Sequence, residues 1–163
     1  MATTTTEKKP SSTCKKLVVK VKKLSDNAML PKAQTEGAAC YDLTTVESVR
    51  VRNTNAEFTS VMIPTGLAFE IPEGYHMKIF LRSGIGLNTK IRLSNHVGII
   101  DSDYRGEVKL LVENHSRQPV DIPAGTRIAQ CLIEKNIPVT FSEVKELSGT
   151  KRGKGGFGST GKE

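Results

Sequence analysis

Residues 107–113 read EVKLLVE, a stretch in which apolar side chains occupy every second position. Val108, Leu110 and Val112 alternate there with charged residues and one further leucine. Successive side chains of a strand point to opposite faces of a sheet, so a period of two predicts a strand with one face on a core. We therefore expect this segment to be a strand.

Short runs of the same kind recur along the chain between turn signals. They occupy residues 17–24, 46–52, 58–63, 66–71, 75–81, 127–134 and 137–141. The pattern Ile-Pro-x-Gly punctuates them at 63–66, 71–74 and 122–125, where proline presets the second turn position and glycine tolerates the exit conformation. No segment between 17 and 147 keeps a helical period over three turns, although a short helix can follow residue 82, where the strand pattern breaks. This spacing predicts an all-β sandwich or barrel.

The composition is that of one domain with an aliphatic core. The chain has 163 residues, 37% of them hydrophobic, but only 5% are aromatic and none is Trp. The apolar runs are far shorter than the roughly 20 residues of a membrane helix, so no membrane partner is expected. Three widely spaced cysteines without a CxxC pair predict neither a disulfide framework nor a structural zinc site. We expect an intracellular protein with reduced thiols.

The net charge of +7 is concentrated at the two ends of the chain. Residues 1–23 carry seven Lys against one Glu, and residues 150–163 carry four cations against one Glu, which leaves −2 for residues 24–149. A nucleic-acid partner is therefore unlikely for the folded body. We expect residues 1–16 to be a disordered basic tail, compatible with nuclear import in a protein of the cytoplasm or nucleus. Residues 17–147 would then form the barrel, and the glycine-rich residues 148–163 a mobile arm.

The densest polar stretch is 95–107, NHVGIIDSDYRGE. Taken alone, it reads best as a solvated turn, because Ser, Asp and Gly are common in turns. Asp101 and Asp103 would share one face if this stretch were a strand. The apolar run at 97–100, however, places Asp101 at the edge of something buried. A carboxylate so placed can act as a general base on a water molecule beside an electrophile.

Two further stretches carry polar groups at the ends of apolar runs. Residues 80–84, FLRSG, offer a forked donor, a hydroxyl and a close backbone approach to a phosphate, in Arg82, Ser83 and Gly84. The simpler alternative is an ordinary strand-to-loop junction. Asp42, in GAACYDL, is by itself better explained as a strand-edge or capping residue than as a residue associated with a metal.

Five stretches in this order resemble the motifs of the trimeric deoxyuridine triphosphatases (dUTPases). They are 37–43 (GAACYDL), 82–86 (RSGIG), 95–106 (NHVGIIDSDYRG), 125–131 (GTRIAQC) and 152–161 (RGKGGFGSTG). The third and fifth are the specific ones, and the resemblance spans residues 17–161. The chain departs from the usual family pattern at Cys40, where glycine is common, at Leu81, where proline is common, and in 87–93.

The resemblance implies a jelly-roll-like β-barrel, a homotrimer with sites between subunits, and a flexible C-terminal arm that closes over the site. It implies hydrolysis of dUTP to dUMP and diphosphate with Mg²⁺ held mainly by the substrate phosphates. This reaction keeps uracil out of DNA and supplies dUMP for dTMP synthesis.

The resemblance also implies roles for individual residues. Asp101 would activate the water that attacks the α-phosphate, Tyr104 would pack against deoxyribose and exclude a 2′-hydroxyl, and Asp42 would hold a metal-bound water. The uracil-reading hairpin and its neighbour would be Asn95, Gly98, Ile99, Ile100 and Lys109. The phosphate cradle would be Arg82, Ser83 and Gly84, with Gln130 as a phosphate-side or neighbouring-subunit contact. The arm would supply Arg152, Phe157 over uracil, Gly158, Ser159 and Thr160.

Two alternatives stay open at this point. A dCTP deaminase-like enzyme shares the implied fold, but would release ammonia from dCTP. A non-catalytic module with a basic tail would bind DNA in a strongly salt-dependent way and hydrolyse no nucleotide.

Overall fold

The computed structural model describes residues 16–54 and 60–156. Within these ranges the chain forms eleven strands and one short helix. The elements are β1 (Lys20–Lys23), β2 (Tyr41–Thr44), β3 (Val49–Val51), β4 (Val61–Pro64), β5 (Leu67–Glu70), β6 (Tyr75–Leu81), α1 (Ser83–Asn88), β7 (Ile91–Leu93), β8 (Gly98–Ile100), β9 (Lys109–Asn114), β10 (Val120–Ile122) and β11 (Arg127–Lys135). The all-β prediction is confirmed.

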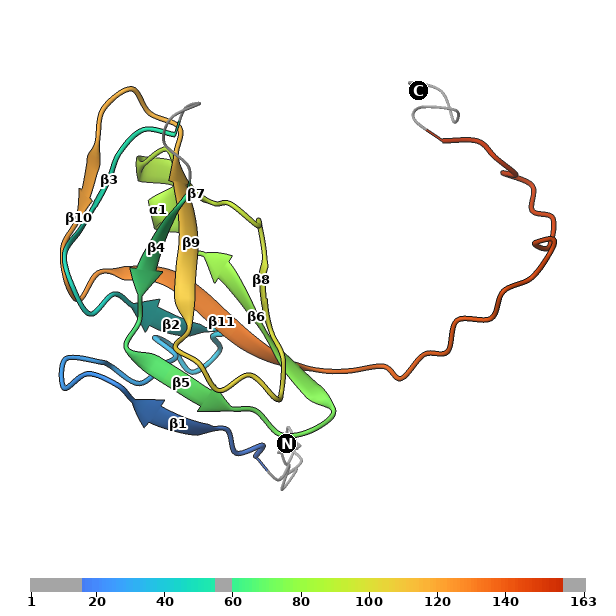
Figure 1. Ribbon diagram of the computed structural model, residues 1–163, viewed down its shortest axis with the longest axis horizontal. Coiled ribbons are helices and arrows are strands. Elements are labelled where there is room, and N and C mark those ends of the chain that lie inside the picture. The colour runs from blue at the N-terminus through green and yellow to red at the C-terminus, as the bar shows by residue number, and fades with distance from the viewer. Residues whose placement is uncertain (1–15, 55–59, 157–163) are drawn as a thin grey trace, which may run out of the picture.

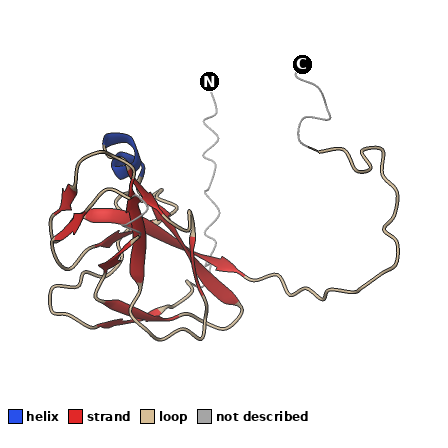
Figure 2. Cartoon of the chain, turned by 45° about the horizontal axis from the view of Figure 1, so that its top comes forward, coloured by secondary structure: helices blue, strands red, loops and turns tan. Residues whose placement is uncertain are grey.

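The strands pair antiparallel in four small sheets that surround one core (Figures 1 and 2). The largest sheet has the order β2-β11-β6-β8, and a second sheet has the order β4-β9-β7. Strands β1 and β5, and strands β3 and β10, form two-stranded ribbons. Strand β11 joins the largest sheet together, because β2 pairs with one of its edges and β6 with the other.

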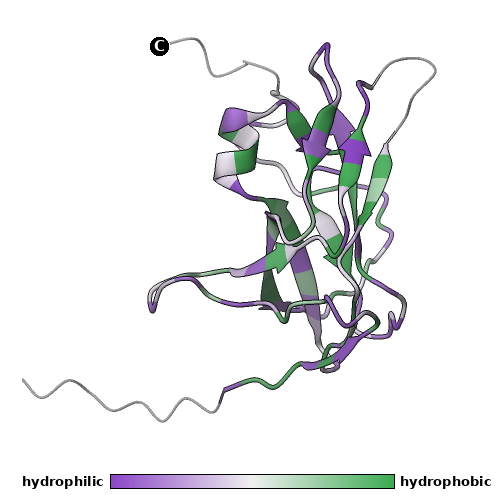
Figure 3. Cartoon of the chain, turned by 90° about the vertical axis from the view of Figure 1, so that its left-hand side faces the viewer, coloured by the Kyte–Doolittle hydropathy of each residue, from purple (hydrophilic) through white to green (hydrophobic). Residues whose placement is uncertain are grey.

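The core is aliphatic, as the composition predicts. Phe69 is the one aromatic side chain among the buried hydrophobic residues that the structure describes. In Figure 3 apolar and polar segments alternate along the strands, as expected when one face of each sheet packs on the core. Val108, Leu110 and Val112 are buried, whereas Lys109 and Leu111 between them are exposed.

The three Ile-Pro-x-Gly turns are confirmed. Gly66, Gly74 and Gly125 have φ angles of 66°, 79° and 76°, in the left-handed region that favours glycine. The short helix after residue 82 is also confirmed, as α1.

One local expectation is wrong. Residues 137–141 form no strand, although their apolar residues alternate, because the described chain offers them no neighbouring strand edge with which to pair. The favoured interpretation of Asp101 and Asp103 as turn residues is confirmed, since β8 ends at Ile100 and the two carboxylates follow it outside any strand. Four short strands, β2, β7, β8 and β10, lie outside the runs from which the sequence analysis predicted strands.

Within the residues described, no helix has the length and apolar character needed to cross a membrane.

Candidate active site

The site begins at the edge of the largest sheet, where β8 pairs with β6. Gly98 lies opposite Ile79, and Ile100 opposite Met77. A Cβ atom at position 98 would lie only 3.2 Å from the Cβ of Ile79, so glycine allows the hairpin to pack closely against β6. The strand ends at Ile100, and Asp101 follows directly with an exposed side chain.

An open cavity of about 510 Å³ lies beside this hairpin. Five residues predicted from the sequence line it together: Ile99, Ile100, Asp101, Tyr104 and Lys109. The cavity thus places one carboxylate, one ammonium and one phenol ring beside the backbone of an apolar strand. Such a mixture suits a small polar ligand with a flat ring.

Three further residues line the same cavity and were missed by the sequence analysis. They are Met62, Glu107 and Val108. Met62 comes from β4, and no local pattern could have placed it there. Glu107 directly follows the motif that contains Asp101. Its position next to that motif was the one feature of the sequence that could have placed it at the cavity.

The ring of Tyr104 is held against its own turn. Its hydroxyl donates a hydrogen bond to the carbonyl oxygen of Glu107 at 3.0 Å, and its backbone N–H donates to the carbonyl oxygen of Asp101 at 3.3 Å. A Cβ atom at position 106 would collide with the phenol ring. Gly106 therefore leaves the space that the ring occupies.

A second polar cluster forms around Asp42 on β2, where the carboxylate is only 9% exposed. Arg82 Nε lies 3.1 Å from one carboxylate oxygen, and an Nη atom of Arg127 lies 3.3 Å from the other. Two guanidinium groups offset the cost of burying this charge. Gln130 on β11 lies directly opposite Asp42 in the β2–β11 register.

Strand pairing explains how Arg82 reaches this cluster. Arg82 directly follows β6, and its backbone N–H donates to the carbonyl oxygen of Ile128 on β11, the strand that lies between β6 and β2. Its guanidinium also donates to the carbonyl oxygen of Arg127 at 3.1 Å. Arg127 lies in the fourth motif, but the sequence analysis assigned it no role.

Ser83 and Gly84 follow Arg82 as the first residues of α1, and both are exposed. A Cβ atom at position 84 would meet nothing within 4 Å. Unlike Gly98, Gly84 therefore has no packing reason within this chain to be glycine. The open space fits the predicted close approach of a ligand to the backbone.

The structure thus divides the predicted residues into two groups. Asp101, Tyr104 and Lys109 line the hairpin cavity, whereas Asp42, Arg82 and the position of Gln130 belong to the second cluster. Asn95 is exposed in the turn before β8 and does not line the cavity. Arg152 lies in the segment after β11, where its Nε donates to the carbonyl oxygen of Gly155 at 2.9 Å. Phe157, Gly158, Ser159 and Thr160 lie outside the described residues.

A cysteine beside the second cluster is chemically quiet. Cys131 on β11 is buried, and burial raises the pKa of its thiol from an ordinary 9.0 to about 12. A thiol with such a pKa holds its proton at neutral pH and is no nucleophile.

The acidic residues that the structure describes form no protein cage for a metal. Across residues 16–54 and 60–156, no group of three or more His, Cys, Asp or Glu side chains could hold a metal ion. Both oxygens of Asp42 already face guanidinium groups. A magnesium ion held mainly by phosphates needs only one or two protein carboxylates, so a site with Asp42 as its nearby carboxylate fits such an ion.

Comparison with known proteins agrees with this geometry. The family model of dUTPase matches residues 26–161. The deoxyuridine 5′-triphosphate nucleotidohydrolase of Nautilia profundicola is 46% identical over 144 residues, which cover 88% of this chain and 99% of that protein. The corresponding protein of Hydrogenobaculum sp. is 46% identical over 141 residues, with coverage of 86% and 96%.

The fold agrees as well. The dUTPase of Staphylococcus bacteriophage 80alpha, determined with dUPNHPP, superposes with a TM-score of 0.79 at 27% sequence identity, covering 88% of this chain and 98% of that one. The predicted jelly-roll-like β-fold is therefore confirmed, and the chain belongs to the dUTPase family.

Proposed function

We propose that this protein is a dUTP diphosphatase, which hydrolyses dUTP to dUMP and diphosphate. The observation that carries the proposal is the single cavity that gathers Asp101, Tyr104 and Lys109 beside the β8 backbone. Membership of the dUTPase family supports the substrate, and relatives in that family carry the name of this activity. In a cell the reaction would keep uracil out of DNA and supply dUMP for dTMP synthesis.

In this mechanism Asp101 is the general base. Among the described residues its carboxylate makes no hydrogen bond or ion pair, so both oxygens are open to a water molecule. The carboxylate accepts a proton from this water as the water attacks the α-phosphate. Phosphoryl transfer needs little covalent help beyond such positioning and the neutralisation of charge.

The second cluster supplies positive charge for the phosphates. Arg82 and Arg127 share the single carboxylate of Asp42, so this group of three side chains keeps a net charge of +1. Preorganised cations of this kind stabilise charge that develops in the transition state. Mg²⁺, when bound with the triphosphate, would neutralise further phosphate charge, and Asp42 is the residue that would hold its water.

The hairpin provides the specificity. The backbone of Gly98, Ile99 and Ile100 can read the edge of uracil, whose donor and acceptor pattern differs from that of cytosine. Packing of Gly98 against Ile79 keeps the hairpin tight, which disfavours the methyl group of thymine. Tyr104 would exclude a ribose hydroxyl.

We propose further that the active form is a homotrimer. Figure 1 shows the chain after β11 leaving the body. This segment exposes large apolar side chains. Ile137 is 84% exposed and Phe141 is 95% exposed, a state that a second copy of the chain would relieve. A site shared between subunits would also bring together the two groups of residues that one chain keeps apart. The arm at 148–163 would close over that site and exclude water.

We propose an intracellular protein of the cytoplasm or nucleus. The two described cysteines, Cys40 and Cys131, are both free thiols, which fits a reducing compartment.

The test is diphosphate release from dUTP, dCTP, dTTP and UTP in the presence of Mg²⁺, with ammonia measured in parallel. We expect rapid release from dUTP alone. Ammonia from dCTP would favour a deaminase instead, and a folded protein inert toward all four nucleotides would refute the proposal.

A further inference from the structure

Glu107 lines the cavity of Asp101 and Tyr104, and it makes contacts in three directions. One carboxylate oxygen accepts the backbone N–H of Gly66 at 2.9 Å, and the other lies 3.4 Å from the ammonium nitrogen of Lys109. Its carbonyl oxygen accepts the hydroxyl of Tyr104 at 3.0 Å. The side chain of Glu107 is only 23% exposed, and its bond to Gly66 is partly buried, whereas Lys109 and the hydroxyl of Tyr104 lie on the exposed side. One residue therefore joins a turn of the core to both the ring and the cation of the cavity.

Hydrogen bonds tie the turn that anchors Glu107 to the chain around Val108. Gly66 ends the Ile-Pro-x-Gly turn at 63–66 with a φ of 66°. Beside it, the hydroxyl of Thr65 donates to the carbonyl oxygen of Val108 at 2.6 Å, and the N–H of Val108 donates to the carbonyl oxygen of Leu67 at 2.8 Å. The carboxylate of Glu107 thus completes a latch that fastens residues 107–108 to the turn.

The latch reaches the tyrosine through the backbone. The carbonyl oxygen of Glu107 accepts the hydroxyl of Tyr104, and the carboxylate of Glu107 accepts the N–H of Gly66. Gly106, between them, has no side chain that could support the ring, and its backbone is the freest of any residue type. Without the carboxylate, the peptide between 106 and 107 gains freedom to turn, and the ring of Tyr104 loses its fixed acceptor.

We propose that Glu107 is a positioning residue that sets discrimination between deoxyribose and ribose by fixing Tyr104. This inference rests on the proposed function, in which the ring of Tyr104 excludes a 2′-hydroxyl. Pockets reject an added hydroxyl only weakly, and exclusion by shape requires a wall that does not yield. A tethered ring provides such a wall, whereas a ring free to move by about 1 Å does not.

The test compares kcat/KM for dUTP and for UTP in Glu107→Ala and Glu107→Gln. We expect Glu107→Ala to lower the dUTP/UTP ratio about tenfold, mainly by admitting UTP, because a hydrogen bond to a charged group is lost. Glu107→Gln keeps an amide oxygen that accepts the N–H of Gly66, so its ratio should stay within about twofold of the wild type.

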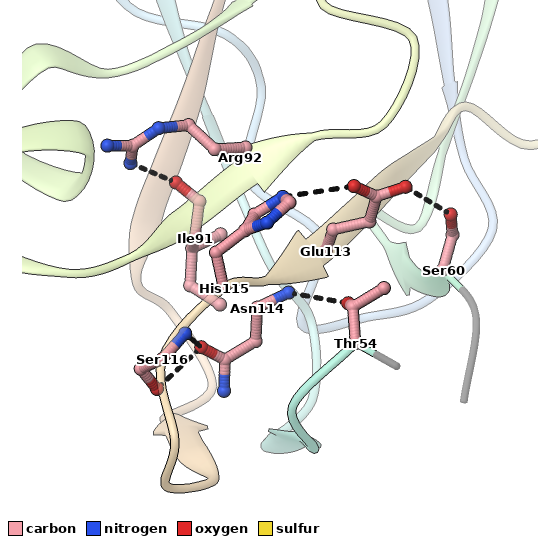
Figure 4. Close-up of polar contacts among 8 residues, drawn as sticks. All are labelled: Thr54, Ser60, Ile91, Arg92, Glu113, Asn114, His115 and Ser116. Atoms are coloured by element: carbon pink, nitrogen blue, oxygen red, sulfur yellow. Dashed lines mark hydrogen bonds and ion pairs between the residues drawn. The ribbon is translucent and has the colours of Figure 1, made fainter. Parts of the chain in front are cut away.

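Glu113→Ala is the matched control. Glu113 lies on β9 with a side chain that is 27% exposed, and it pairs with His115 at 3.1 Å and with Ser60 at 3.3 Å, away from the cavity (Figure 4). Its loss should lower stability without changing the dUTP/UTP ratio. An unchanged ratio in a folded Glu107→Ala protein, or an equal loss in Glu113→Ala, would overturn the proposal.

A double-mutant cycle with Tyr104→Phe tests whether Glu107 changes the dUTP/UTP ratio through the hydroxyl of Tyr104. Tyr104→Phe keeps the ring but removes the hydroxyl that Glu107 holds, so it should lower the ratio by itself. In that background Glu107→Ala should cause no further loss, because both changes break one connection. Additive effects would refute the inference. A normal ratio in Tyr104→Phe would refute it even if Glu107→Ala fails to fold. A wild-type protein that releases no diphosphate from dUTP would instead refute the proposed function, and this inference with it.

Discussion

Asp101 lies between two cavities of the surface and lines both of them. It lines the cavity of Tyr104 and Lys109, and it also lines a groove of about 710 Å³ with Glu70, Glu73 and Arg105. Its side chain is exposed and contributes nothing to the core. A residue in this position can be changed with little effect on folding, so its chemistry can be tested separately from stability.

We predict that Asp101→Asn loses most of its turnover while keeping its fold. An amide cannot take the proton of the attacking water, and loss of a general base costs about 10²- to 10⁴-fold in rate. The measurements are kcat for dUTP and binding of a non-hydrolysable analogue, which should persist. Normal turnover by this variant would show that another group is the base.

Cys131 gives a prediction about pH. Because burial raises the pKa of its thiol to about 12, only about 10⁻⁴ of it is thiolate at pH 8. In the folded protein Cys131 should resist iodoacetamide at pH 8, whereas the partly exposed Cys40 reacts, as peptide mass spectrometry would show. Rapid alkylation of Cys131 in the native state would contradict this burial.

The sign of the linked stability follows from the same shift. The unfolded chain releases this proton near pH 9, but the folded chain keeps it until about pH 12. The contribution of Cys131 to stability is therefore complete below pH 9 and is lost as the pH rises toward 12.

At the scale of elements, the repeated Ile-Pro-x-Gly turns serve different packing environments. Gly66 and Gly74 both have positive φ angles, but a Cβ atom at position 66 would lie 2.7 Å from Val46 Cγ1 and 3.0 Å from the Cβ of Ala28. A Cβ atom at position 74 would meet nothing within 4 Å. The two turns thus share a backbone conformation and differ in what surrounds it.

We predict that Gly66→Ala destabilises the protein more than Gly74→Ala. The left-handed conformation alone costs about 1–2 kcal/mol for alanine, which both variants bear. Overpacking against Val46 and Ala28 should raise the cost at position 66 to about 2–4 kcal/mol. Urea unfolding of the two variants measures the difference. Equal losses would show that the core around Gly66 yields without cost.

At the scale of the whole molecule, the barrel is built of paired strands around a buried core, whereas the described part of the segment that follows it forms no strand and is exposed. Strand pairing ends with β11 at Lys135, and the described residues beyond it are almost all exposed (Figure 1). A segment with this many uncovered apolar side chains is suited to contact with other copies of the chain. Its glycine-rich end carries the last motif of the family.

Removal of residues 150–163 should leave a folded oligomer whose kcat/KM for dUTP falls by about a hundredfold or more, because the site no longer excludes water. Removal of residues 1–16 is the matched control, since each deletion removes a net charge of +3. The second deletion should leave kcat/KM nearly unchanged. Equal losses of kcat/KM would mean that both ends act by attracting the substrate through their positive charge, and that the arm does not close over the site.

Much of the fold and half of the site could be read from neighbouring residues. Alternation along β9, the three proline-glycine turns and the turn that contains Asp101 are all local, because side-chain direction and backbone dihedrals depend on adjacent positions. Ile99, Asp101 and Tyr104, which line the hairpin cavity, are close in the chain, but their joint role was predicted from the family resemblance.

Contacts between distant segments required the folded chain. Arg127 reaches Asp42 across 85 positions, and Met62 enters the cavity from another sheet. The segment at 137–141 carries the alternation of a strand but forms none, because a strand needs a partner edge as well as a pattern. Local chemistry therefore sets what each segment can become, and long-range pairing selects which of these possibilities the native packing stabilises.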